Sequence, residues 1–231
     1  MKNIVIATIK EWNINNYFEL KKELENEYSF YLISNKDELS LEQIEKINPK
    51  YIFFPHWSWI IPENIYKNYE CILFHMTDLP YGRGGSPLQN LIINKVYNTK
   101  ISALKVTKGL DEGDIYLKED FDISKGSANE IYINASKLIF KKLIPNILRQ
   151  NPTPVRQEGD VVNFKRRTPE QSNIKMLNDV SIANLYDFIR MLDAPSYPKA
   201  YLELDNLKME LFEVIIKDGK LEGRFEVSKH E

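Results

Sequence analysis

The sequence predicts an α/β fold, in which a doubly wound and mostly parallel sheet is followed by a small β-rich C-terminal subdomain. Short apolar runs and amphipathic runs alternate through the first half of the 231 residues, as in βαβ units. A composition of 43% hydrophobic and 28% charged residues is that of a globular protein with one main core. From Asn151 onwards, prolines and polar residues precede a β-rich tail. We therefore expect a Rossmann-like domain at residues 1–150, and a linker, helix and β-rich subdomain at residues 151–231.

Each element follows from its local pattern. Short apolar runs predict strands at residues 4–7, 29–33, 51–54, 71–74 and 101–106. Amphipathic runs predict helices at residues 17–26, 40–46, 86–94, 128–149 and 179–191. Ser40 caps the second helix, and Pro145 interrupts the end of the fourth. In the tail, residues 200–225, the pair Asp218-Gly219 predicts a hairpin turn.

The strongest functional signal is His75, one of three histidines in the chain. It follows a buried strand and precedes a loop rich in glycine and proline, whose backbone can approach a ligand closely. A structural histidine at a strand end is the alternative, and the rigid loop favours function. A second signal is Asp111, within Gly-Leu-Asp-Glu-Gly-Asp. Because a carboxylate fixes the tautomer of an imidazole and raises its basicity, we expect His75 and Asp111 to form an acid–base pair.

These two signals resemble the formyltransferase family that uses 10-formyltetrahydrofolate, whose members include methionyl-tRNA and sugar formyltransferases. The family pattern is Asn-x-His, then Leu-Pro-x-x-Arg-Gly-x-x-Pro, then Gly-Leu-Asp-x-Gly-Asp, and residues 75–89 and 109–114 match it without a gap. Residues 164–169 resemble a segment of sugar-nucleotide formyltransferases, and His-Met-Thr-Asp at 75–78 is similar to a subgroup from the pseudaminic acid pathway. The resemblance covers roughly the first two thirds of the chain well and continues more thinly beyond.

The resemblance implies roles for particular residues. His75 and Asp111 are the expected catalytic pair, and Asp111 is also expected to contact the folate. An aromatic segment just beyond a strand is similar to the region where relatives build their folate pocket, and there we expect contacts from Trp59, Ile60 and Ile61. Residues expected at the acceptor are Thr77, Arg83, Gly84, Gly85, Arg166 and Arg167. Guanidinium groups suit a diphosphate because they bind it in two places at once.

Leu73 is a departure from the family, because it occupies the position of the family's asparagine. Leucine has no hydrogen-bond donor, whereas the asparagine amide polarises the formyl oxygen, a role worth about 3 kcal/mol for a single donor. The candidates for a replacement are protonated His75, the Thr77 hydroxyl and a backbone N–H of the glycine-rich loop. The departure also motivates one alternative, an inactive binding protein of the same fold.

Composition and motifs exclude several other classes. The balance of 31 basic and 33 acidic residues, a net charge of −2, gives no general attraction to nucleic acid. Cys71 is the single cysteine, so it forms neither an intrachain disulfide nor a metal cluster. The first strand is not followed by Gly-x-Gly-x-x-Gly, which disfavours a dinucleotide enzyme. No signal peptide or membrane-spanning run is present, so we expect a cytoplasmic protein without a membrane partner.

The sequence therefore predicts a metal-independent, folate-dependent sugar N-formyltransferase. The expected reaction moves the formyl group of 10-formyltetrahydrofolate to the amine of a nucleotide-linked amino sugar, a UDP-4-amino-dideoxy sugar of the pseudaminic acid type used in cell-surface glycans. The second alternative is a methionyl-tRNA formyltransferase-like enzyme, which the near-neutral charge and the short tail weaken. A homodimer is left open.

Overall fold

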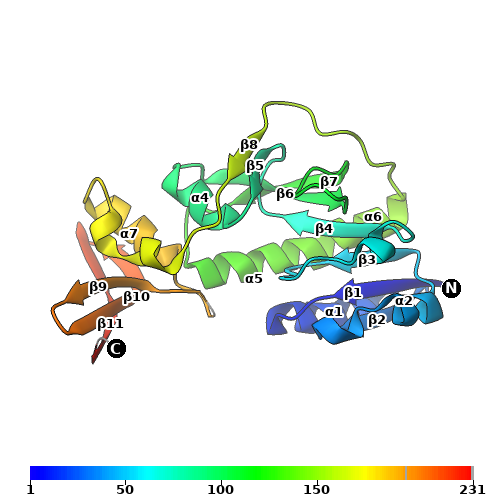
Figure 1. Ribbon diagram of the computed structural model, residues 1–231, viewed down its shortest axis with the longest axis horizontal. Coiled ribbons are helices and arrows are strands. Elements are labelled where there is room, and N and C mark those ends of the chain that lie inside the picture. Colours follow the sequence, from blue (N-terminus) through cyan, green and yellow to red (C-terminus); the bar gives the residue numbers. More distant parts are fainter. Residues whose placement is uncertain (196, 230–231) are drawn as a thin grey trace. The chain divides into compact units, whose positions relative to one another are not determined.

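The computed structural model describes residues 1–195 and 197–229, and Ser196, His230 and Glu231 lie outside the described part. The chain forms two compact units (Figure 1). The first unit comprises Met1–Arg83, Lys100–Phe121 and Ile133–Asn163. The second comprises Gly84–Thr99, Asp122–Tyr132 and Phe164–Glu231. Segments from the middle of the chain thus belong to the same unit as its C-terminal third.

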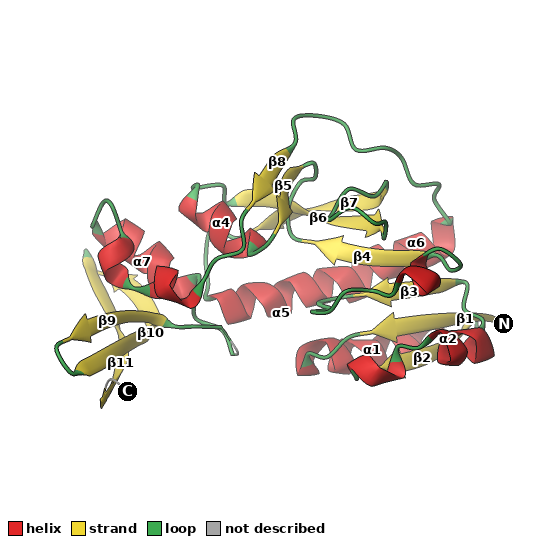
Figure 2. Ribbon diagram, viewed as in Figure 1, coloured by secondary structure: helices red, strands yellow, loops and turns green. Residues whose placement is uncertain are grey.

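The central sheet has six strands in the order β2-β1-β3-β4-β6-β7, shown as arrows in Figure 2. Its strands are β1 (Lys2–Ala7), β2 (Tyr28–Ile33), β3 (Tyr51–Phe54), β4 (Cys71–His75), β6 (Asn98–Lys105) and β7 (Ile115–Asp122). β1 pairs in parallel with β2 and β3, and β3 pairs in parallel with β4. β4 and β6 are antiparallel. The predicted α/β class with a mostly parallel sheet is confirmed, and the carboxyl ends of β1, β3 and β4 share one edge of it.

The longer helices of the first unit follow the predicted amphipathic runs, whereas the short η1 (Lys36–Glu38) and α3 (Glu63–Tyr66) were not predicted. The longer ones are α1 (Glu11–Leu24), α2 (Leu41–Ile47) and the run of α5 (Ala128–Leu138), η2 (Ile139–Leu143) and α6 (Ile144–Gln150), which starts in the second unit. The Ser40 side chain accepts from the Gln43 N–H, as its predicted capping role requires. The expected single helix over residues 128–149 contains a π-helical segment, η2, just before Pro145. Proline has no N–H for the helical ladder, and a π turn is one way to absorb that loss.

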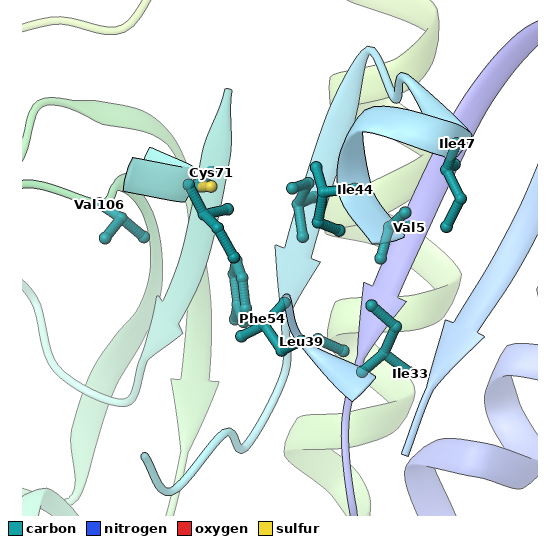
Figure 3. Packing of buried hydrophobic residues seen from close by; sticks show 11 residues of the cluster. Val5, Ile33, Leu39, Ile44, Ile47, Phe54, Cys71 and Val106 are labelled. Carbon is teal, nitrogen blue, oxygen red and sulfur yellow. The ribbon is translucent and has the colours of Figure 1, made fainter. Parts of the chain in front are cut away.

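The core of the first unit packs on the predicted strands. Val5, Ile52 and Cys71, from β1, β3 and β4, belong to one buried cluster with Ile44 of α2 (Figure 3). Each of these side chains is at most 1% exposed. Burying a leucine- or isoleucine-sized side chain stabilises a fold by about 1.5–3 kcal/mol. This cluster therefore fixes the strands that end at the shared edge.

The second unit contains a small antiparallel sheet. Its elements are α4 (Pro87–Ile93), η3 (Pro169–Ser172), η4 (Ile174–Met176), α7 (Ile182–Arg190), β9 (Ala200–Leu204), β10 (Leu207–Lys217) and β11 (Lys220–Lys229). The strand order is β11-β10-β9. Lys217 pairs with Lys220 across a turn in which Asp218 and Gly219 have φ of 49° and 72°. The predicted Asp-Gly hairpin is thus confirmed, since both central residues adopt positive φ.

Three strands have no counterpart in the predicted elements. β7 completes the central sheet, and β5 (Tyr81–Gly84) and β8 (Val162–Phe164) form a two-stranded sheet. β5 lies in the glycine-rich loop, and the second half of β7 is mostly charged, with Lys118, Glu119, Asp120 and Asp122, so neither has the continuous apolar run of a buried strand. Among the described residues, no helix has both the length and the apolar character needed to cross a bilayer.

Candidate active site

His75 ends β4 at the edge of the sheet where the parallel strands finish (Figure 1). In open α/β sheets, ligands bind outside the carboxyl ends of the strands. The ring is 7% exposed, and its Nε2 lies 2.8 Å from the carbonyl oxygen of Gly82. Because a carbonyl oxygen only accepts, Nε2 carries the hydrogen of this bond. The opposite ring nitrogen, Nδ1, lies 3.6 Å from Asp111 Oδ2.

The expected pairing of His75 and Asp111 is therefore present in the geometry. The 3.6 Å separation is longer than a hydrogen bond, and catalytic hydrogen bonds are often long until substrate binds. Both ring nitrogens thus face an oxygen atom, Nε2 that of the Gly82 carbonyl and Nδ1 that of the Asp111 carboxylate. Asp111 is 7% exposed, so little water competes for its carboxylate.

Asp111 lies in a tight turn between β6 and β7. Its φ is 54°, in the left-handed region that asparagine and aspartate tolerate better than most residues. Two residues on, a Cβ added to Gly113 would lie 1.8 Å from the Lys105 carbonyl oxygen. Only glycine fits at this close approach. The glycine of the Asp-x-Gly-Asp part of the motif, residues 111–114, thus has a steric reason beside any chemical one.

Arg83 reaches the same turn through Gln157. Its Nε and a terminal nitrogen donate to Gln157 Oε1 at 3.1 and 2.8 Å. The Gln157 amide nitrogen in turn donates to the carbonyl oxygens of Asp111 and Gly113, each at 2.8 Å. A further guanidinium nitrogen of Arg83 lies 3.7 Å from Glu112. Arg83, expected at the acceptor, is thus tied to the Asp111 turn, and its contact with acceptor stays a prediction.

Thr77 is fully buried beside His75. Its hydroxyl donates to the Gly82 carbonyl oxygen at 3.3 Å, the same oxygen that accepts from His75. The Thr77 carbonyl accepts from the Ser102 hydroxyl at 2.7 Å. The structure therefore brings Thr77, His75 and Gly82 together, and the contact of Thr77 with acceptor stays a prediction.

The aromatic segment after β3 is partly open to solvent. The Trp57 and Trp59 rings meet edge to face at 5.0 Å, and Trp59 is 38% exposed. Ile60 is 95% exposed, whereas Ile61 packs against the core cluster. These three expected folate residues thus differ: Trp59 and Ile60 present apolar surface to solvent, and Ile61 anchors the segment.

Buried polar atoms surround this segment. The indole nitrogens of Trp12 and Trp57 and the side-chain oxygen of Asn13 are buried without a hydrogen-bond partner. The Asn13 amide nitrogen approaches Thr8 and His56, at 2.8 and 3.3 Å. Burial, with the charge of Lys10 as a smaller cause, lowers the pKa of His56 to about 4. His56 is therefore neutral at physiological pH.

Gly84, Gly85 and the two arginines at 166 and 167 lie together in the second unit. A Cβ on Gly84 would lie 2.4 Å from the Phe164 carbonyl oxygen, and one on Gly85 would lie 2.6 Å from Arg166 Cβ. Arg166 is exposed. Arg167 is half-buried over the Phe188 ring at 5.9 Å and donates to the Gln171 carbonyl oxygen. Burial lowers the pKa of the Arg167 guanidinium from its ordinary value.

Cys71 is a structural residue. Cys71 is 1% exposed in the core cluster, and burial, followed by the charge of Glu70, raises the pKa of its thiol to about 12. Such a thiol is inert as a nucleophile. Within the described ranges, no group of three or more histidine, cysteine or acidic residues could hold a metal ion.

Gln157 and Ser102 are the residues that sequence reasoning missed. Ser102 is fully buried, and Gln157 lies in an irregular segment after two prolines. Neither stands in a motif, because each acts through a contact with a distant part of the chain. The available signal for Ser102 was a polar residue within the short apolar run from Ile101 to Leu104.

Comparisons with known proteins identify relatives of this chain. The family described as "Methionyl-tRNA formyltransferase, C-terminal domain" matches residues 169–228. A methionyl-tRNA formyltransferase from Campylobacter jejuni subsp. doylei is 27% identical over 199 residues, which are 85% of this chain and 64% of that protein. A solved structure described as methionyl-tRNA formyltransferase from Clostridium thermocellum is 49% identical with a TM-score of 0.95. That alignment covers 99% of this chain and 100% of the other.

A more distant structure has the same fold. HypX from Aquifex aeolicus, solved in complex with tetrahydrofolic acid, is 19% identical, with a TM-score of 0.72 and coverage of 94% of this chain and 39% of HypX. At this identity the likeness shows the fold alone.

The comparisons correct the expected acceptor. The interpretation as a sugar N-formyltransferase acting on a nucleotide-linked amino sugar of the pseudaminic acid type is wrong. The relative at 49% identity over its full length and the match at residues 169–228 both carry the name methionyl-tRNA formyltransferase, which was the alternative. The chain spans 64% of the Campylobacter protein. Because the Clostridium thermocellum protein is 49% identical to this chain and is covered over its whole length, the chain belongs to the formyltransferase family.

Proposed function

We propose that this protein transfers the formyl group of 10-formyltetrahydrofolate to the amine of methionyl-tRNA. The observation that carries the proposal is the 49% identity, over 99% of the chain, to a protein named methionyl-tRNA formyltransferase. The match of residues 169–228 to the C-terminal domain of such enzymes supports it independently. The pairing of His75 Nδ1 with Asp111 at 3.6 Å supplies the acid–base groups that acyl transfer to an amine requires.

The residues at the edge of the sheet fit a reduced folate. A pteridine is a flat ring with donors and acceptors along its edge, and the exposed face of Trp59 offers it an apolar surface. The buried and unpartnered indole nitrogen of Trp57 is a donor of the kind such a ring can use. Trp59, Ile60 and Ile61 would hold the ring, and Asp111 would face its reactive end. The folate would supply, when bound, the formyl carbon that the acceptor amine attacks, and the bond from that carbon to the folate nitrogen would break as tetrahydrofolate leaves with a proton in its place.

The residues of the chain then act on the proton and on the developing charge. Asp111 orients His75 and can take a proton from the amine as it becomes bonded to carbon. The Nε2 hydrogen of His75 is the proposed donor for the formyl oxygen, which would compete with Gly82 O for it. Because Leu73 has no donor, this hydrogen carries more of the oxyanion stabilisation than it would beside an asparagine.

The proposed tRNA acceptor is not what the net charge of the chain predicts. The chain carries a net charge of −2, from which we expected no binding to nucleic acid. A sum over the whole chain does not describe a local surface, however, and the three basic residues 165–167 are consecutive. We therefore assign the exposed Arg166 to a phosphate of the tRNA. Thr77, and separately Gly84 and Gly85, stay proposed contacts of the acceptor.

The test is direct product analysis. Purified protein, 10-formyltetrahydrofolate and methionyl-tRNA are incubated, the ester bond is hydrolysed, and the released amino acid is weighed by mass spectrometry. We expect a mass gain of one formyl unit on methionine. Free methionine and a tRNA charged with a different amino acid serve as control acceptors and should gain nothing. Absence of formyl-methionine under conditions where the protein binds folate would refute the proposed acceptor.

A further inference from the structure

The side-chain amide of Gln157 links Arg83 to the turn that carries Asp111. Its oxygen accepts two hydrogen bonds from Arg83, at 3.1 and 2.8 Å. Its nitrogen donates to the carbonyl oxygens of Asp111 and Gly113, at 2.8 Å each. Both donor hydrogens and the acceptor oxygen of the amide are therefore in use. A half-buried glutamine in an irregular loop seldom has so complete a set of protein partners.

The turn that Gln157 holds needs such support. Asp111 adopts φ of 54°, a conformation that costs a non-glycine residue free energy and persists only when its surroundings hold it. The Asp111 and Gly113 carbonyls lie between the ends of β6 and β7. A rotation of this turn moves the Asp111 carboxylate relative to His75 Nδ1, which is 3.6 Å away.

Only a carboxamide of this length meets all four contacts. A glutamate would keep an acceptor for Arg83 but would turn a carboxylate oxygen towards two carbonyl oxygens. A leucine would leave the guanidinium and both carbonyls without a partner. The two substitutions therefore separate the Arg83 side of the contact from the Asp111 side.

We propose that Gln157 is a positioning residue for formyl transfer, which acts by fixing Asp111 against His75, with Arg83 as the anchor of its amide. The proposal rests on the proposed function for its kinetic test alone. It gives Arg83 a role in holding the Asp111 turn, independent of any contact with acceptor.

The kinetic test is a double-mutant cycle in formyl transfer. We expect Gln157→Leu to lower kcat about tenfold or more, as misplacement of a reacting group does, with the KM for 10-formyltetrahydrofolate changed less than about twofold. Gln157→Glu should be impaired as strongly. Added to Asp111→Asn, Gln157→Leu should cause little further loss, because the group it positions is already disabled. Independent, multiplicative losses, or wild-type turnover in Gln157→Glu, would overturn the proposal.

A second measurement does not depend on activity. The ring ¹⁵N resonances of His75 report its contacts, and the chain has only two other histidines. We expect Gln157→Leu to shift the His75 ring signals towards those of Asp111→Asn, while Gln150→Leu, at an exposed helix end, leaves them unchanged. Unshifted His75 signals in Gln157→Leu would refute the positioning role. If the protein does not formylate methionyl-tRNA yet the shift occurs, the proposed function fails and the positioning role stands.

Discussion

His75 and Thr77 share one acceptor, the Gly82 carbonyl oxygen, at 2.8 and 3.3 Å. This oxygen fixes the ring of His75 from one side while Asp111 faces it from the other. The pair was predicted from the sequence because its residues stand in motifs of recognisable composition. Gln157 was not predicted, since nothing near it in the sequence marks a contact with Asp111. The sequence therefore indicates reactive residues where they belong to a motif, and it does not indicate the residues that hold them in place.

We expect His75→Asn and Asp111→Asn each to lower turnover about a hundredfold or more, the usual loss when general acid–base catalysis is removed. Asparagine is chosen at position 111 because it tolerates the left-handed backbone there. Thermal unfolding should stay close to wild type in both variants. A correctly folded His75→Asn with near-normal turnover would show that the chemistry lies elsewhere.

His56 makes stability depend on pH. The unfolded chain binds a proton on this ring near pH 6.5, and the folded chain near pH 4, because burial lowers the pKa. The contribution of His56 to the free energy of unfolding is therefore complete above pH 6.5 and is lost as the pH falls towards 4. A shift of this size corresponds to about 3 kcal/mol.

Urea unfolding at pH 7.5 and pH 4 measures this effect. Wild type should lose about 3 kcal/mol more than His56→Asn between the two pH values, since asparagine does not titrate and accepts the positive φ of 52°. Equal losses in the two proteins would mean that the folded state does not disfavour the charged ring.

At the scale of elements, the parallel strands were predicted closely and the connections less well. The apolar runs of β3 and β4 identify them because both faces of these strands are buried. α1 begins at Glu11, ahead of the expected residue 17, since three of its first six residues are asparagines, which are weak helix formers. β5 was not predicted, because its glycines, which let the loop approach its neighbours, are not typical of a strand. Local patterns thus reveal elements that bury apolar faces and conceal those fixed by tertiary contacts.

The turn between β6 and β7 should not accept a side chain at position 113. In Gly113→Ala the added carbon meets the Lys105 carbonyl oxygen at 1.8 Å, so the turn that carries Asp111 must move. We expect a loss of about 2 kcal/mol or more in urea unfolding, together with reduced turnover.

Gly219→Ala is the control without a close approach, because no atom lies within 4 Å of its added carbon and the substitution tests only the positive φ of 72°. This substitution should lower the free energy of unfolding by about 1 kcal/mol, which is the cost of a positive φ for a residue with a Cβ. If Gly113→Ala is no worse than this control, the close approach at Lys105 is relieved at little cost.

At the scale of the whole molecule, the sequence predicted the family and not the acceptor. The motifs around His75 and Asp111 serve the formyl transfer that family members share, so they carry little information about what is formylated. The expectation of a sugar nucleotide depended on residues 164–169 and on net charge. Neither describes how the second unit, which contains residues 164–231, meets a large acceptor.

The two arginines of this segment should behave differently. Arg166→Ala should raise the KM for methionyl-tRNA, leave that for the folate unchanged, and reduce the salt slope of tRNA binding by about one, the signature of a lost phosphate contact. Arg167→Ala should instead lower the free energy of unfolding by about 1 kcal/mol, because its guanidinium packs over Phe188. Unchanged tRNA kinetics in Arg166→Ala would remove this residue from the acceptor site.

The most direct test of the account is the rate of formyl transfer to methionyl-tRNA by the pure protein, measured as kcat/KM for wild type and for His75→Asn at saturating 10-formyltetrahydrofolate. We predict that wild type forms formyl-methionyl-tRNA catalytically, and that the variant loses about a hundredfold or more while still binding the folate. Wild-type protein that binds folate and transfers nothing to methionyl-tRNA, or a variant equal to wild type, would contradict it.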